Sequence, residues 1–143
     1  MATISAYNHI QLIQGQKLVS LTADTFKLAL MDNVHAFTAT NTAWANVSAN
    51  EIASANGYTT PGQNLATLTW TESAGTATWD AANVTWTATG GAITAYHGVL
   101  YDDTVISPAD ALMFSIDFQG VQTAGDGTPF NVNWNASGIY TVG

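Results

Sequence analysis

Alternation of apolar and polar residues, the pattern of β-strands, recurs along most of this chain. Phe26, Leu28 and Leu30 alternate with less apolar positions, which predicts a core strand buried on one face. The same two-residue period recurs between Gly-, Asn- and Asp-rich turns, at 65–71, 76–79, 84–88, 93–101, 112–118, 130–134 and 139–142. Short strands at this spacing, with no long helix, predict an all-β fold: an antiparallel β-sandwich or barrel, jelly-roll-like in type.

Turn signals indicate which of these strands are neighbours. Two short turns join the three strands between residues 65 and 88, so these strands are expected to form a meander. Asp102, Asp103 and Pro108 are expected to bracket the turn that follows the strand at 93–101. These signals predict a sheet in which strands close in sequence pair with one another.

Two parts of the chain lack the strand pattern. The N-terminal part, residues 1–23, contains Ile10 and Ile13 at a spacing that fits a short helix as well as an extended arm, and both remain open. Residues 32–62 are rich in Asn, Ala and Thr without a sustained period, which predicts a long connection. Long irregular connections in compact domains often carry function. We therefore expect residues 1–143 to form one β-domain with two candidate contact segments.

Charged residues are scarce, and their balance is acidic. They make up 8% of the chain, against about a quarter of an average soluble domain, and the formal net charge is −8. Lys17 and Lys27 are the only cations, so the chain cannot neutralise phosphates and no nucleic acid partner is expected. No membrane partner is expected either, since no stretch approaches the roughly 20 apolar residues that span a bilayer. A surface of Thr, Ser, Asn and Gln suits burial against protein.

One histidine has carboxylates nearby in the sequence. His97 precedes Asp102 and Asp103, an arrangement that a general base could use. Ala95 and Val99 share its strand face, however, which favours a hydrogen-bonded histidine in a core or an interface. Metal-ligand spacings and nucleotide-binding glycine loops are absent from the sequence. We therefore expect no catalytic residue, no cofactor and no metal site.

Aspartates concentrate in the C-terminal third, where a carboxylate pair could serve glycoside hydrolysis or calcium binding. Most of them stand beside Gly or Pro at predicted turns, where Asp is favoured because it accepts hydrogen bonds from nearby backbone amides. Asp117 lies inside a predicted strand and is expected to be bound by backbone amides or to mark a strand edge. The group comprises Asp102, Asp103, Asp110, Asp117 and Asp126.

Short motifs in a fixed order are similar to those of small structural proteins from tailed-bacteriophage particles. They are Asp24–Leu30, Gly57–Thr60, Val84–Ala88, Val99–Thr104, Ile116–Phe118 and Trp134–Ile139, and they run along nearly the whole chain. This resemblance implies a non-enzymatic head decoration or cement protein that binds the phage major capsid protein where capsid subunits meet. It also implies a homo-oligomer, with a trimer favoured, located on the capsid surface of the virion and in the host cytoplasm during assembly.

Two segments are expected to make the intersubunit contacts. Loop length and the expected exposure of aromatic side chains select the N-terminal segment and the arm within 32–62. The residues selected are Tyr7, Ile10, Ile13, Tyr58 and Pro61. Other functions stay open: a tail, fibre or neck component, a carbohydrate-binding module with Trp and Tyr platforms, and a hydrolase built on His97 and an aspartate.

Overall fold

Antiparallel sheets dominate the computed structural model, which describes residues 2–143 and has ten strands within them. The strands are β1 Thr3–Ala6, β2 Phe26–Met31, β3 Gln63–Asn64, β4 Thr69–Ser73, β5 Thr76–Asp80, β6 Val84–Thr87, β7 Ile93–Ile106, β8 Ala109–Ala124, β9 Pro129–Val132 and β10 Tyr140–Val142. The prediction of an all-β, antiparallel, sandwich-like fold is confirmed.

Helices are few and short. They are α1 Ile10–Gly15 and the 3-10 turns η1 Trp44–Asn46 and η2 Ser48–Asn50. The N-terminal part therefore forms both an edge strand, β1, and a short helix, which settles the alternative that the sequence left open. No helix within residues 2–143 is long and apolar enough to cross a membrane.

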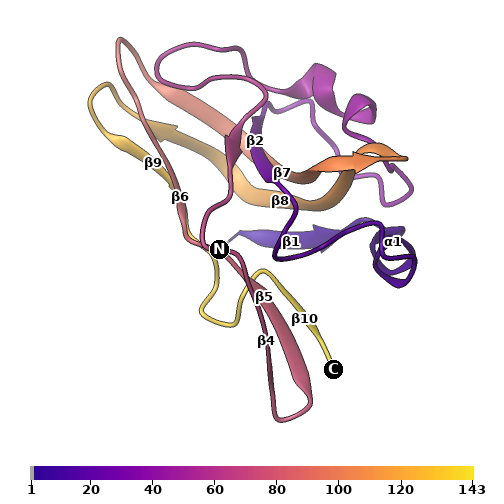
Figure 1. Cartoon of the computed structure of the whole chain (residues 1–143). Helices are drawn as coiled ribbons and strands as arrows, with labels where there is room; N and C mark the ends of the chain where they lie inside the picture. The colour runs from indigo at the N-terminus through magenta and orange to yellow at the C-terminus, as the bar shows by residue number, and fades with distance from the viewer. Residues whose placement is uncertain (1) are drawn as a thin grey trace.

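The central layer is a five-stranded sheet in the order β1-β8-β7-β2-β3 (Figure 1). Its longest elements, β7 and β8, form one hairpin that turns at Ser107 and Pro108. Asp102 and Asp103, expected at the turn, instead lie inside β7, and Asp102 pairs with Ala111 of β8. The turn prediction was wrong for the two aspartates because the alternation of β7 continues past them to Val105, which is buried.

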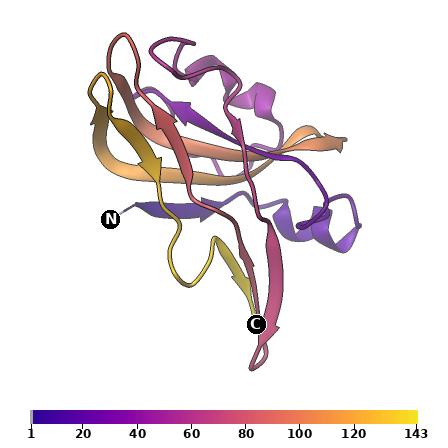
Figure 2. The ribbon, with the colours of Figure 1, turned by 60° about the vertical axis from the view of Figure 1, so that its left-hand side comes forward.

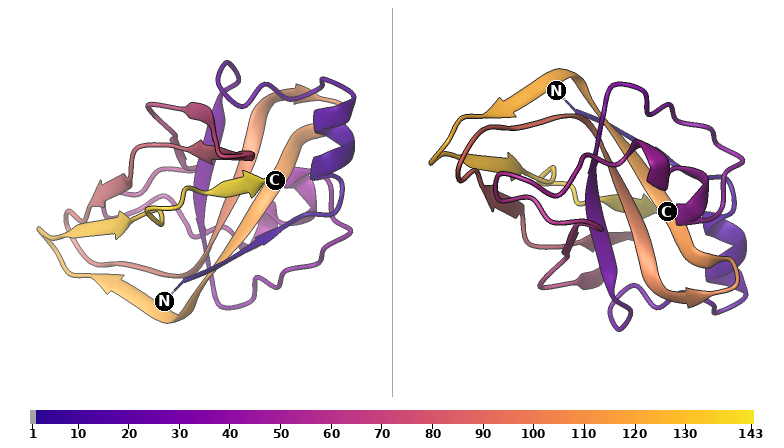
Figure 3. Two further views of the ribbon diagram at one scale, coloured as in Figure 1. Left: turned by 90° about the horizontal axis from the view of Figure 1, so that it is seen from below. Right: turned by 90° about the horizontal axis from the view of Figure 1, so that it is seen from above.

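Two smaller sheets form the second layer, β10-β5-β4 and β6-β9. They lie on one side of the central sheet, and the connection 32–62 lies on the other (Figures 2 and 3). The first two strands of the predicted meander do pair, with Trp70 opposite Trp79. The third does not join them, because β6 pairs with β9, about 45 residues later, through Trp86 and Phe130. The C-terminal strand β10 likewise pairs with β5.

Aromatic side chains fill the space between the two layers. Trp79 is fully buried, packs edge-on against Phe26 with ring centroids 4.8 Å apart, and donates its indole N–H to the carbonyl of Leu21 at 2.7 Å. The indole polar group is thus satisfied inside an apolar core, as a buried tryptophan requires. Ile139 N–H donates to the Trp79 carbonyl at 2.7 Å, so this one residue joins distant parts of the chain to the core.

The connection 32–62 covers the outer face of β2 and bonds to the end of β2 that β3 does not reach. Ile52 N–H donates to the Leu30 carbonyl at 3.0 Å, and Asp32 N–H donates to the Asn50 carbonyl at 2.9 Å. Beneath the connection lies a second apolar cluster that includes Met31 and Val47. Since β2 is buried on both faces, the prediction of a single buried face was wrong. The reason is that a sheet covered on both sides needs no polar face.

Candidate functional site

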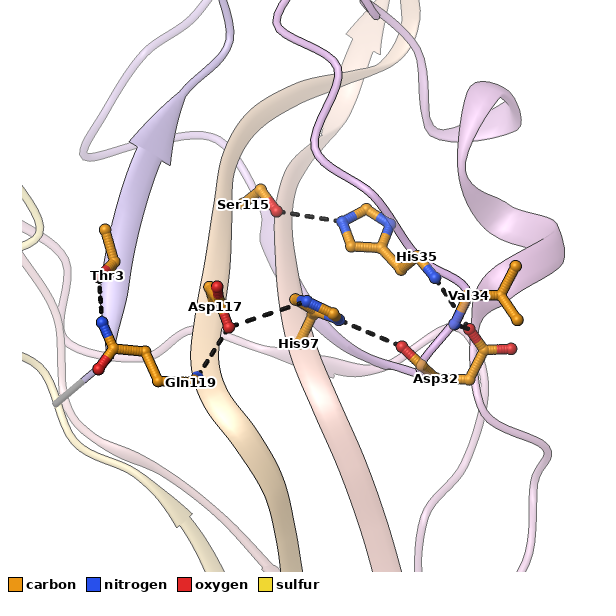
Figure 4. Close-up of polar contacts among 8 residues, drawn as sticks. All are labelled: Thr3, Asp32, Val34, His35, His97, Ser115, Asp117 and Gln119. Atoms are coloured by element: carbon orange, nitrogen blue, oxygen red, sulfur yellow. Dashed lines mark hydrogen bonds and ion pairs between the residues drawn. The ribbon is translucent and has the colours of Figure 1, made fainter.

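The most concentrated group of reactive side chains lies on the outer face of the central sheet, under the start of the connection 32–62 (Figure 4). His97 comes from β7, and Ser115 and Asp117 come from β8. His35 and Asp32 come from the segment that leaves β2. Antiparallel pairing places His97 directly opposite Asp117, which brings the two strands' contributions together.

Hydrogen bonds fix the two imidazole rings. His35 Nε2 lies 3.1 Å from Ser115 Oγ, and His97 Nδ1–H donates to the Asp32 carbonyl at 3.2 Å. The ring centroids of the two histidines are 5.2 Å apart in an edge-on contact. On its other side, His97 Nε2 lies 3.8 Å from Asp117 Oδ1, an ion pair only when His97 is protonated.

Burial keeps His35 neutral. Only 3% of its surface is exposed. Burial lowers the pKa of His35 to about 4, the nearby His97 acts in the same direction, and the carboxylate of Asp32 opposes them. A charged imidazole would be poorly solvated here, since its Nδ1 has no hydrogen-bond partner among the described residues.

The contact between Ser115 and His35 has the composition of a nucleophile and its base, but not the access that such a pair needs. Ser115 is 4% exposed and lies in a strand that is paired on both sides, with Ser5 of β1 and Val99 of β7. A substrate carbonyl has no approach to an oxygen in that position. The arrangement is that of a polar cluster holding the connection 32–62 against the sheet.

Sequence reasoning found His97 but missed the Ser115–His35 contact. The two residues are 80 positions apart, and neither stands in a recognisable motif. His97 was expected to be a hydrogen-bonded histidine in a core or an interface, and its bond to Asp32 agrees with the hydrogen bonding. Asp117 meets its expectation too, because its Oδ1 accepts the backbone N–H of Gln119 at 2.7 Å.

Four of the five predicted contact residues are buried in the chain's own core. Tyr7 is 1% exposed, and Ile10, Ile13 and Tyr58 are each 2% exposed. The expectation that these four side chains are exposed for contact was wrong, because they pack inside the subunit. The fifth residue, Pro61, is exposed, and its carbonyl accepts the Tyr101 hydroxyl at 3.0 Å.

Tyr58 shows why the predicted arm is not free. Its hydroxyl donates to Glu51 Oε1 at 2.6 Å and accepts the backbone N–H of Leu30 at 3.0 Å. Burial raises the pKa of Tyr58 well above its usual value, and burial also raises the pKa of Glu51. The aromatic residue that the sequence placed on the surface instead fastens the connection to β2.

The aspartates are dispersed. Among the described residues, no group of three or more His, Asp or Glu side chains is arranged to hold a metal ion. Asp126 accepts the backbone N–H of Gly90 at 2.8 Å, as expected for a turn. Asp102 is fully buried, and burial raises its pKa to about 7, although the N–H of Thr104 bonded to Oδ1 at 2.8 Å acts the other way.

Large apolar side chains remain on the surface and offer more to a partner than the polar cluster does. Ile106 is the most exposed, at 89%. The others are Leu12, Leu18, Val34, Phe37, Trp70, Val121 and Val142. The chain as a whole has only two cations and ten acidic residues. The candidate functional site is therefore a surface and not a pocket.

Comparisons with known proteins identify no relative. No family model, no curated protein and no solved structure matches the chain.

Proposed function

We propose that this chain is a non-enzymatic structural protein that packs against other protein subunits, as a decoration or cement protein of a tailed-phage capsid. The observation that carries the proposal is the exposed apolar side chain of Ile106 at the tip of the longest hairpin, in a chain with few charged residues. A solvent-exposed isoleucine at a hairpin tip contributes nothing to the fold of its own subunit. It does contribute when a partner buries it.

The hairpin tip belongs to one end of the molecule, where three segments meet (Figure 1). Hydrogen bonds join the turn before α1, the segment around residue 40 and the first part of β8. They run from Asn8 N–H to the Ala39 carbonyl and from Leu112 N–H to the Thr42 carbonyl, both 2.9 Å. Leu12 and Phe37 on these segments are exposed by 59% and 40%. We call this end, with Leu12, Phe37 and Ile106, the apolar end.

Modest contacts suffice for such a role. Buried apolar surface contributes about 25 cal/mol per Å² before the cost of association is subtracted. On a shell, many copies bind a repeating lattice, and an oligomer that binds through several subunits dissociates slowly even if each contact is weak. The proposed partners are the phage major capsid protein and further copies of this chain, a trimer being the favoured oligomer. The proposed location is the capsid surface, with the host cytoplasm during assembly.

Carbohydrate binding is the second candidate, and it depends on Trp70. Trp79 and Trp86 are buried, and Trp44 stacks on Tyr101 with centroids 4.5 Å apart, so these rings form no open platform. Trp70 is 39% exposed and lines a hollow together with the polar Gln14, Ser20 and Thr22 and the apolar Val19 and Leu21. Saturable signals on a glycan array that disappear in Trp70→Ala would favour this function over the first.

Binding to shells tests the structural role. Shells are prepared from a phage whose gene for this chain has been deleted, and purified protein is added back. After sedimentation, the number of bound copies per copy of the major capsid protein is counted. The expected result is saturation at a fixed ratio, together with greater resistance of the shells to heat.

The matched variants are Ile106→Asp and Val121→Asp, which place the same charge at two exposed apolar positions of one hairpin. Ile106→Asp is expected to weaken shell binding at least tenfold, whereas Val121→Asp binds like the unmodified protein. Absence of saturable binding would overturn the proposed role. Equal binding by both variants would show that the apolar end is not the surface that contacts the shell.

A further inference from the structure

The three-stranded sheet β10-β5-β4 projects from the body of the molecule, and β4 forms its outer edge (Figures 1 and 2). All five residues of β4 are exposed, in contrast to the central strands. The other strands at the edges of the three sheets are shorter than β4. β4 is thus an open strand edge of five residues.

Register determines which backbone groups of β4 face outward. Ala74 and Gly75 have φ values of 51° and 85°, the two left-handed residues of a type I′ turn. The turn closes on the pair Ser73 and Thr76, and the ladder continues without a bulge. In such a ladder alternate residues bond to the partner strand, so Ser73, Thr71 and Thr69 bond to β5. The N–H and C=O groups of Trp70 and Glu72 point away from it.

The usual protections of an exposed edge are missing from β4. Proline, lysine and bulges discourage pairing with other chains, and the sequence TWTES contains none of them. The one charged residue, Glu72, is turned toward its own hairpin, since its Oε1 accepts the Gly75 N–H at 2.6 Å. Thr and Trp are residues that favour strands. The edge is suited to accept another strand.

We propose that β4 pairs with β4 of a second copy of this chain, antiparallel, about a two-fold axis beside Thr71. In this register Trp70 of each copy lies opposite Glu72 of the other, and each of these pairs exchanges two backbone hydrogen bonds. The outward groups of both residues are thereby satisfied. The three-stranded sheets of the two copies become one continuous six-stranded sheet, β10-β5-β4 of one copy followed by β4-β5-β10 of the other.

Charge and symmetry favour a second copy over an unrelated strand. When the pair is centred on Thr71, the Glu72 of each copy lies opposite Trp70 and not opposite the other Glu72. Two copies of this acidic chain can therefore pair without placing like charges directly opposite each other. The edge is its own complement under a two-fold rotation, the commonest symmetry of protein oligomers. The alternative, β4 against the open edge of β10, offers three residues and gives a ring or a fibre. The pair does not depend on the proposed capsid role, because the apolar end lies on other elements.

Cysteine substitutions test the register, since the chain contains no cysteine of its own. Across the proposed axis the two Thr71 residues form a non-hydrogen-bonded pair with Cα atoms about 4.5 Å apart, within the range that a disulfide spans. Thr71→Cys is therefore expected to form a covalent dimer under mild oxidation. Thr69→Cys is the matched control, an exposed threonine on the same strand face. Its copies are roughly 13 Å apart in the pair.

Light scattering on the purified protein measures the association itself. The unmodified chain on its own is expected to be a dimer, in place of the trimer that the phage resemblance implies. Thr71→Lys, which sets two lysines opposite each other, is expected to raise the dissociation constant at least tenfold. Thr69→Lys adds the same charge without this opposition and leaves the dimer intact. A monomer at all concentrations, a trimer, or equal disulfide formation by both cysteine variants would overturn the proposal. Because these measurements use no phage shell, their failure is distinguishable from failure of the capsid role.

Discussion

The central sheet and the projecting sheet are both built from antiparallel strands, yet they differ in what covers them. In β8, residues 111–116 are all buried, between the second layer on one face and the connection 32–62 on the other. In β4, every residue is exposed. Trp70 and Trp79 face each other across the ladder of the projecting sheet, but only Trp79 reaches the core. An alternating pattern thus indicates a strand and one apolar face, and the stacking of layers decides what that face meets.

Truncation of the two paired tryptophans gives the largest contrast. Trp79→Ala removes a fully buried ring and its hydrogen bond to Leu21, and is expected to lower the free energy of unfolding by about 3–5 kcal/mol. Trp70→Ala removes a ring that is 39% exposed and is expected to lower it by about 1 kcal/mol. Urea denaturation measures both, in a Thr71→Lys background so that association does not contribute. Equal losses would mean that the projecting sheet is as well packed as the core.

Two glycines sharpen the comparison, because both have left-handed φ angles in different surroundings. A Cβ at Gly62, where φ is 99°, would collide with the carbonyl of Leu28, whereas a Cβ at Gly75, where φ is 85°, meets no atom within 4 Å. Gly62→Ala is expected to lower the free energy of unfolding by about 3 kcal/mol, and Gly75→Ala by about 1 kcal/mol from backbone strain alone. Thermal denaturation compares them. A similar loss in both would contradict the tight fit of the connection against β2.

Removing the buried carboxyl of the central sheet has an expected effect that depends on pH. The pKa of Asp102 is about 7 in the folded chain and about 3.8 when exposed, so its stabilising contribution is complete below pH 3.8 and is lost as the pH rises through 7. Asp102→Asn keeps an oxygen for the Thr104 N–H and cannot ionise. Its free energy of unfolding, relative to the unmodified chain, is expected to be higher at pH 8 than at pH 5 by on the order of 2 kcal/mol.

The free energy of unfolding of the variant must be compared with that of the unmodified chain at the same pH, because His35 makes the stability of both proteins depend on pH in the opposite direction. Its pKa of about 4 in the folded chain means that its contribution is complete above pH 6.5 and is lost as the pH falls toward 4. Subtracting the unmodified chain at each pH cancels this term. Asp126→Asn, on an exposed turn, removes a charge of the same sign and is the control. If the free energy of unfolding of Asp102→Asn, relative to the unmodified chain, does not change with pH, then water reaches the Asp102 carboxyl.

Local features of the fold could be predicted, and long-range pairings could not. The core strand at Phe26 and the tight turn before Thr76 were predictable from strand period and turn residues. The pairing of β6 with β9 was not, because a two-residue period carries no information about the partner strand. The extent of β7 was underestimated because two consecutive aspartates indicate a turn unless one of them is buried, as Asp102 is.

The candidate site shows the same division. The sequence indicated a surface poor in charge, but it selected Tyr58 and Ile10, which the fold buries. For an aromatic residue in a long connection, the neighbouring sequence does not show whether the side chain is exposed for contact with a partner or buried in the core. Ile106 was overlooked because it lies next to the turn at Pro108. The predicted strand alternation ends before this position, so nothing in the pattern marks Ile106 as exposed. Exposure is a property of the assembled layers, and only the fold supplies it.

Trp70 also gives the molecule an optical reporter that needs no label. It is the most exposed of the five tryptophans and lies on the open edge of β4, while Trp79 and Trp86 are shielded. A soluble quencher such as acrylamide will therefore reach mainly this one indole and the partly covered Trp44 and Trp134. Whatever occupies the edge of β4 alters the accessible fraction of the emission, so occupancy of the edge can be followed in solution by fluorescence from the natural sequence.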